Sequence, residues 1–396
     1  MSNRLKLFRE RMAAFEGAAD PSAAIESGYY VHAPGKLLVD EISARIALRP
    51  SSSHLLLGGI GSGKTTQLLV ACKQINEIED THAIYVDVSL YTYISKITTG
   101  VLTAIAGLEL ANLMKDSKDD NVIQSIDLIR KLAHGYTYYD DGYYYEPDYD
   151  EQLISVKGII PKKVEGYGIN SELVETVNKL AKCASENYGN LVILFDGLDR
   201  INDIKTFMQL VFSDAKAISS AGIGLVLVGP ITAIYSNYRD TVDKILDYFY
   251  YQPFFDIEND QDAYNFFEEI IKNRSSEDFI EESAMKALIQ FSGGVLRDFI
   301  AITQASLEET YISGDEKLQE KQVLKAVDST GRNQLLGLSD NELKIIKQML
   351  KNKKFIPITD EDLRLLVKRV ILEYRYPKLR YAVHPAIKPL IQQILD

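Results

Sequence analysis

The sequence predicts an α/β fold in which a doubly wound parallel sheet is followed by a block of helices and a small C-terminal module. Two observations predict it. Short apolar runs alternate with segments whose apolar residues recur at helical spacing. These runs are almost continuously apolar, which is typical of parallel strands covered on both faces. We therefore expect strands at 53–57, 83–88, 191–195, 224–228 and 249–254.

A glycine-rich loop follows the first expected strand and precedes a helical pattern. Residues 58–65 fit the phosphate-binding pattern G-x-x-x-x-G-K-[ST]. Glycines let the backbone fold around an anion, and the loop amides and helix N-terminus then point at phosphate oxygens. Lys64 is expected to reach the β- and γ-phosphates, and Thr65 to hold Mg²⁺. The predicted nucleotide-binding residues of this P-loop NTPase core are Gly58, Gly59, Ile60, Gly61, Ser62, Gly63, Lys64, Thr65 and Thr66.

An acidic residue ends the third expected strand. Asp196 follows the apolar run 191–195, so a buried strand would deliver its carboxylate to the sheet edge where ligands bind. Asp196 is therefore predicted as a catalytic residue and, with Thr65, as a Mg²⁺ ligand. Asp199 is a candidate to orient or deprotonate the attacking water. Its alternative role is to cap the helix that follows.

ATP is the expected nucleotide because the patterns for other nucleotides are incomplete. A dinucleotide fold needs G-x-G-x-x-G, and Gly61-Ser62-Gly63 is followed by no third glycine. Guanine-specific enzymes usually carry N-K-x-D, whereas the segment 178–181 reads Asn-Lys-Leu-Ala. We therefore expect ATP and Mg²⁺ as cofactors.

Composition limits the function further. The 396 residues are 46% hydrophobic and 25% charged, as in ordinary folded proteins. The net charge of −12 argues against a general nucleic-acid coat. Cys72 and Cys183 lie far apart in sequence, which favours neither a zinc site nor a disulfide framework. The first fifteen residues do not resemble a secretory signal, and the longest apolar run, 222–235, is too short to span a bilayer. We expect a cytoplasmic protein without membrane contact.

Four parts are expected along the chain. Residues 1–50 form an N-terminal helical segment, 51–256 the ATPase core, 257–327 a helical lid and 333–396 a winged-helix domain, with a linker around 328–333. The core carries an insertion at about 134–152 that is rich in tyrosine and acidic residues. Tyrosine offers rigid contact area at low entropic cost, so this insertion either contacts a partner or packs on its own domain.

The C-terminal segment has the outline of a winged helix. Ser339 with Glu342, and Thr359 with Asp362, fit capping boxes that begin helices. Two short apolar runs, 370–375 and 379–383, then predict a hairpin, and a last helix is expected at 386–395. Residues 333–396 hold 12 Lys/Arg and 7 Asp/Glu, a net of +5. This basic surface favours either DNA or a protein partner.

Together, the loop at 58–65 and the ending Asp196-Gly197-Leu198-Asp199 resemble AAA+-type ATPases of the branch shared by origin-recognition ATPases and STAND signalling ATPases. This resemblance implies that Arg297 touches the γ-phosphate from the lid. It also implies an arginine finger, for which Arg239 is a candidate and a solvated charge the alternative. Gly197 stands where many AAA+ proteins have a catalytic glutamate. Either Asp199 replaces it or hydrolysis is slow.

Less specific positions follow from the same resemblance. Thr232 is a candidate polar sensor after the strand at 224–228, and His32 lies where related proteins hold adenine. His32 is equally well explained as a structural residue.

Two functions remain open at this point. One is an ATPase with low turnover that acts as a molecular switch, forms a homo-oligomer on ATP binding and contacts a protein partner through the winged helix or the tyrosine-rich insertion. Its settings would include defence signalling or a DNA transaction. The alternative is a DNA-binding winged-helix module in which ATP is a structural ligand.

Overall fold

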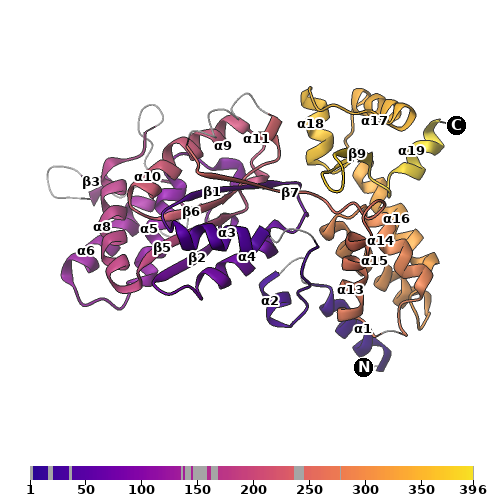
Figure 1. Ribbon diagram of the computed structural model, residues 1–396, viewed down its shortest axis with the longest axis horizontal. Helices are drawn as coiled ribbons and strands as arrows, with labels where there is room; N and C mark the ends of the chain where they lie inside the picture. Colours follow the sequence, from indigo (N-terminus) through magenta and orange to yellow (C-terminus); the bar gives the residue numbers. More distant parts are fainter. Residues whose placement is uncertain are drawn as a thin grey trace. The chain divides into compact units, whose positions relative to one another are not determined.

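The computed structural model describes residues 3–16, 21–34, 38–134, 137–138, 144–145, 158–161, 168–235, 245–276 and 278–395 (Figure 1). The chain divides into two compact units. We call residues 38–57 and 67–251 the sheet unit, and residues 1–37, 58–66 and 252–396 the lid unit. The lid unit thus contains the phosphate loop as well as the helices and the C-terminal module. Each unit is described by itself.

A five-stranded sheet forms the centre of the sheet unit, as predicted. Its strands are β1 (Ser53–Gly58), β2 (Thr81–Asp87), β5 (Asn190–Asp196), β6 (Gly224–Val228) and β7 (Tyr248–Gln252). Their order is β2-β5-β6-β1-β7, and the pairs β1–β6, β5–β6 and β2–β5 are parallel. The strand order places β6 between the strand that leads to the phosphate loop and the strand that ends in Asp196.

Both faces of the sheet are buried, which explains why the strands read as continuous apolar runs. On one face, Leu56, Leu194 and Val226 pack against α3 (Leu38–Leu48) and α4 (Lys64–Ile75). The alternate residues Leu55, Phe195 and Leu227 belong to a second cluster on the other face. The predicted doubly wound α/β architecture is therefore confirmed.

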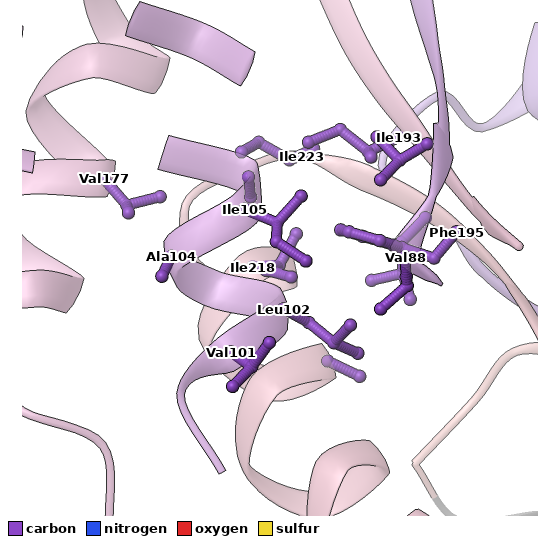
Figure 2. Close-up of a cluster of buried hydrophobic side chains, with 14 of the residues drawn as sticks. Val88, Val101, Leu102, Ala104, Ile105, Val177, Ile193, Phe195, Ile218 and Ile223 are labelled. Atoms are coloured by element: carbon purple, nitrogen blue, oxygen red, sulfur yellow. The ribbon is translucent and has the colours of Figure 1, made fainter. Parts of the chain in front are cut away.

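Helices from the long connection between β2 and β5 fill the second cluster. They are α5 (Val101–Leu113), α6 (Asp120–Ala133) and α8 (Ser171–Tyr188). Figure 2 shows Leu102 and Ile105 of α5 facing Ile193 and Phe195 of β5. The buried carboxylate of Asp214 accepts hydrogen bonds from the backbone amides of Gly100 and Thr103, which fixes the start of α5. The same cluster includes residues of α9 (Ile204–Leu210), the π-helix η5 (Val211–Ala215) and α10 (Lys216–Ser220).

The tyrosine-rich insertion lies largely outside the described residues. Within it the structure shows two short antiparallel strands, β3 (Thr137–Tyr138) and β4 (Tyr144–Tyr145). The choice between a partner contact and packing on its own domain therefore stays open.

In the lid unit, the expected helices of the lid are present. They are α13 (Gln261–Arg274), α14 (Glu282–Ser292) and α15 (Leu296–Ser313). The N-terminal α1 (Asn3–Ala14) packs on them, because Phe8 lies edge-on to Phe279 and the guanidinium of Arg4 donates to the carbonyl of Tyr311. The short α2 (Pro21–Glu26) follows α1.

The C-terminal elements appear in the predicted order. They are α17 (Asp340–Asn352), α18 (Asp360–Val367), the antiparallel pair β8 (Ile371–Tyr374) and β9 (Arg380–Val383), and α19 (Lys388–Leu395). Both predicted capping boxes, at Ser339 and Thr359, are formed. The assignment of this module as a winged helix stays a prediction.

The linker expected around 328–333 is wrong, because α16 (Glu320–Leu335) runs through it. The boundary between lid and C-terminal module predicted there therefore falls inside a helix. Gly331 has a packing role within this helix. A Cβ at Gly331 would lie 2.4 Å from the carbonyl oxygen of Ala386, so glycine lets this helix approach the backbone before α19 closely.

Buried ion pairs join the lid to the C-terminal module within the lid unit. The guanidinium of Arg369 donates two hydrogen bonds, of 3.0 and 2.9 Å, to Asp298 in the first turn of α15. His384 Nδ1 accepts from the amide of Ala386, which leaves its proton on Nε2, 3.3 Å from Asp298. Burial by itself would raise the pKa of Asp298, but the neighbouring His384 imidazole and the charge of Arg369 lower it to about 2.

A second bidentate pair joins the same two parts. Arg380 of β9 donates to both carboxylate oxygens of Asp256, and also to Glu258 at 3.0 Å. The ring of Tyr374 lies under the Arg380 guanidinium, and its hydroxyl donates to the carbonyl of Gly293 at 2.8 Å. These contacts seat the hairpin on the lid.

Cys72 and Cys183 are free thiols, the first buried and the second half-buried. Across the stretches that the structure describes, every helix is too short or too polar to cross a membrane.

We predict that Asp298→Asn lowers the free energy of unfolding by about 3–5 kcal/mol at pH 7, because it leaves the buried Arg369 charge unpaired. The matched control Asp328→Asn removes an exposed Asp328–Arg332 pair and should cost less than about 1 kcal/mol. Urea denaturation monitored by circular dichroism measures both changes.

The pH dependence of that difference follows from the depressed pKa of Asp298. The carboxylate stabilises the fold fully above its unfolded pKa of about 3.9 and loses this contribution as pH falls toward 2. The gap between wild type and Asp298→Asn should therefore narrow between pH 4 and pH 2. Equal losses in Asp298→Asn and Asp328→Asn at pH 7 would contradict this account.

Candidate functional site

The phosphate loop has a backbone that only glycine accommodates at two points. Gly61 and Gly63 adopt φ angles of +89° and +96° between the end of β1 and the start of α4. The loop is also closely packed: a Cβ at Gly59 would lie 2.2 Å from the ring of Phe254. The motif glycines are therefore required both by conformation and by close approach.

Two side chains of the loop are buried. Lys64 is only 4% exposed, and its ammonium donates to the carbonyl oxygens of Gly58 (3.1 Å) and Gly59 (2.9 Å). Ser62 is fully buried, and its hydroxyl has no hydrogen-bond partner among the described residues. A desolvated hydroxyl without a partner is costly, so an incoming acceptor such as a phosphate oxygen would relieve it. Thr65 and Thr66, in the first turn of α4, are half-buried.

The lid contacts this loop directly through the first turn of α15. The amide of Arg297 donates to the carbonyl of Gly61 at 3.3 Å. A Cβ at Gly61 would lie 2.7 Å from Cβ of Arg297, and one at Gly63 would lie 2.8 Å from the side chain of Leu296. The structure thus brings Arg297, predicted from the resemblance alone, next to the phosphate loop, with its side chain exposed.

In the sheet unit, Asp196 occupies the last position of β5 and is 5% exposed. One carboxylate oxygen accepts from the backbone amide of Gly197 at 2.7 Å. The other accepts from the hydroxyl of Tyr85, on the neighbouring β2, at 3.0 Å. Gly197 is left-handed, with φ of +87°, and turns the chain sharply after the carboxylate.

Asp199 does not cap the following α-helix. It lies half-buried within the short 3-10 turn η4 (Leu198–Arg200). The cap of α9 is Asp203, whose carboxylate accepts from the amides of Lys205 and Thr206. The capping alternative for Asp199 is therefore wrong, and its catalytic role stays a prediction.

Thr232 begins the short helix α11 (Thr232–Tyr235), four residues after β6. Within the described part of the chain, its buried hydroxyl has no hydrogen-bond partner. The role of Thr232 as a polar sensor stays a prediction.

Two further positions, Arg239 and His32, were predicted from the resemblance. Arg239 lies outside the described residues. His32 rests edge-on against Tyr30, while its neighbour Val31 packs in the lid core with Phe267 and Phe299. The chain at His32 therefore belongs to the lid unit.

Sequence reasoning missed Tyr85. Nothing in its own strand marks it, because a half-buried tyrosine in a strand is ordinary. Its role emerges only from the register, in which Tyr85 pairs with Leu194 and Asp87 with Asp196.

The residues present fit ATP and Mg²⁺. The loop offers positive-φ glycines, a buried lysine and an unsatisfied serine hydroxyl, which together suit phosphate oxygens. Thr65 in the lid unit and Asp196 in the sheet unit are each oxygen donors of the kind that Mg²⁺ prefers, and their joint role belongs to the proposal below.

We predict that Gly61→Ala, in the lid unit, lowers the free energy of unfolding more than the control Gly222→Ala, in the sheet unit. Both positions have a left-handed φ, which costs an alanine about 1–2 kcal/mol. Only at Gly61 would the new methyl meet another residue, Arg297, whereas nothing lies within 4 Å at Gly222. The additional cost at Gly61 should be about 1–3 kcal/mol, measured by urea denaturation. Equal costs would show that loop and lid are not in contact in solution.

Comparisons with known proteins were made on sequence and on structure. A scan of protein-family models and a search of curated proteins found no match. Among solved structures, the chain is similar to the Aeropyrum pernix ORC2 protein in its ADPNP-ADP complexes, with 16% identity, a TM-score of 0.47, and 92% of this chain and 96% of that chain covered.

It is also similar to the Aeropyrum pernix ORC1 protein in complex with DNA, with 13% identity, a TM-score of 0.45, and 89% and 92% of the two chains covered. A third similar structure is Cdc6p from Pyrobaculum aerophilum, with 14% identity, a TM-score of 0.44, and 96% and 99% covered. The likeness to these proteins is one of fold.

Proposed function

We propose that this chain binds ATP with Mg²⁺, hydrolyses it slowly, and uses the nucleotide state to control assembly or partner binding. The observation that carries the proposal is the phosphate loop: positive-φ glycines surround a buried lysine whose ammonium donates to the carbonyls of Gly58 and Gly59 at 3.1 and 2.9 Å. Phosphate oxygens are stronger acceptors for an ammonium than neutral carbonyls are.

Each predicted residue takes a separate chemical role. Lys64 would turn from the loop carbonyls to the β- and γ-phosphates, and the hydroxyl of Ser62 would gain an acceptor. Thr65 and Asp196 would hold Mg²⁺, which neutralises charge on the transferring phosphoryl group when bound. Asp199 would orient the attacking water and accept its proton. Arg297 would donate to the γ-phosphate from the lid.

Slow turnover is proposed because Gly197 stands where many AAA+ ATPases carry a catalytic glutamate. Gly197 follows Asp196 with φ of +87°, so the chain turns where many AAA+ ATPases carry a glutamate. The remaining candidate base, Asp199, is set in the 3-10 turn that follows. A base that is not ideally placed for water reduces the rate rather than ATP affinity.

A nucleotide-dependent switch would act through the lid. Because the first turn of α15 touches Gly61 and Gly63, γ-phosphate contacts at Arg297 would bias the position of this helix. Ligands can shift a conformational equilibrium only by binding its two states with different affinity. We propose that the ATP-bound state favours a homo-oligomer.

The structure favours a protein partner over DNA for the C-terminal module. Among the described residues, four of its arginines lie beside carboxylates: Arg364 by Glu342, Arg369 by Asp298, Arg375 by Glu373 and Arg380 by Asp256. Arginines already paired in this way release fewer counterions on binding phosphates. The exposed side chains of Ile356, Ile358, Tyr376 and Leu379 suit a protein surface better.

We predict that Lys64→Ala and Asp196→Ala separate binding from hydrolysis. Lys64→Ala should weaken binding of a fluorescent ATP analogue about 10- to 100-fold, because it removes charge-assisted hydrogen bonds to phosphate. Asp196→Ala should retain binding within about tenfold but lose steady-state phosphate release. Fluorescence anisotropy and a phosphate-release assay measure the two effects.

The control for charge is Lys73→Ala, at an exposed position in the last turn of the same helix. It should behave as wild type in both assays. Wild-type binding and turnover in Lys64→Ala and Asp196→Ala would remove the proposed site.

We predict that ATP with Mg²⁺ increases the molar mass measured by size-exclusion chromatography with light scattering, relative to ADP or no nucleotide. Lys64→Ala should stay at the smaller mass in ATP. The assembly part of the proposal fails if wild type has the same mass in all three conditions while ATP binding is intact.

A further inference from the structure

We propose that Tyr85 is a positioning residue whose hydroxyl orients the carboxylate of Asp196 toward Mg²⁺. This inference deepens the proposed function and rests on it. The two side chains come from neighbouring parallel strands, β2 and β5. The hydroxyl of Tyr85 donates to Asp196 Oδ2 at 3.0 Å.

The reach of the tyrosine explains why this residue type is needed. Tyr85 pairs in register with Leu194, two positions before Asp196. Its side chain must therefore run diagonally along the sheet, a span that long aromatic side chains can cover. Serine or threonine at this position could not make the same contact.

The carboxylate is held from two sides. The Gly197 amide donates to Oδ1 at 2.7 Å, while the Tyr85 hydroxyl donates to Oδ2. Two donors on opposite oxygens fix the rotation of the carboxylate plane, which pre-organises it for a metal.

The adjacent Asp87 has partners of its own at this sheet edge. Its Oδ1 accepts from the amide and the hydroxyl of Ser89.

The test is Tyr85→Phe, which keeps the ring and removes only the hydroxyl. The matched control is Tyr91→Phe, because Tyr91 is also half-buried and donates to a carboxylate, Glu109, at 2.5 Å. The readout is the Mg²⁺ concentration at which binding of a fluorescent ATP analogue is half-maximally enhanced. Binding in EDTA is measured beside it.

We expect Tyr85→Phe to raise that Mg²⁺ concentration about 10-fold and to leave binding in EDTA unchanged. Tyr91→Phe should alter neither value. In an Asp196→Ala background, Tyr85→Phe should have no further effect, because the hydroxyl acts through Asp196.

The inference is overturned if Tyr85→Phe has the Mg²⁺ dependence of wild type, or if its effect persists in full without Asp196. If Tyr85→Phe weakens binding of the ATP analogue in EDTA by the same factor by which it raises the required Mg²⁺ concentration, Tyr85 has a structural role only. That result also overturns the inference. Failure of the proposed function gives a different result: wild type itself then binds no ATP at any Mg²⁺ concentration.

Discussion

The contact between the phosphate loop and the first turn of α15 is the constraint on which the lid unit depends. Gly61 accepts a hydrogen bond from Arg297, and no side chain larger than hydrogen fits at Gly61 or Gly63 without displacing that turn. The next residue, Asp298, contacts the C-terminal module instead, because its carboxylate is bound by Arg369 and lies 3.3 Å from His384. Consecutive residues of one helix therefore touch both the phosphate loop and the C-terminal module.

This arrangement requires a charged carboxylate to be buried, which by itself is unfavourable. An isolated carboxylate at 4% exposure would be strongly destabilising, yet the pKa of Asp298 is lowered to about 2 because its partners outweigh burial. Buried pairs of this kind specify one arrangement of helices more than they add net stability. The C-terminal hairpin is held in the same manner, by Arg380 on Asp256. Movement of the module away from the lid would have to expose both pairs.

Much of the fold could be predicted from the sequence, because local physics determines it. Buried parallel strands must be apolar on both faces, and capping boxes at Ser339 and Thr359 need only neighbouring residues. The linker around 328–333 was mispredicted for the opposite reason. A helix continues there instead, and its Gly331 packs against Ala386, far along the chain.

The candidate site shows the same division. The loop at 58–66 and Asp196 are recognisable from sequence, because phosphate binding needs a fixed spacing of residues. The roles of Arg369 and Arg380 are not recognisable from sequence. A basic residue in the C-terminal module suggests a nucleic-acid contact until the structure shows its carboxylate partner. Tyr85 depends on strand register, which a single sequence does not determine. The backbone of Arg297 lies beside Gly61, and the role of its side chain at the γ-phosphate stays a prediction.

The central claim is that main-chain amides, Lys64 and a divalent ion together hold the triphosphate of ATP. Equilibrium dialysis of the purified, folded chain against labelled ATP with Mg²⁺ tests it most directly. The account predicts excess nucleotide on the protein side that saturates near one ATP per chain. Equal nucleotide concentrations on both sides of the membrane, with the protein still folded, would contradict it.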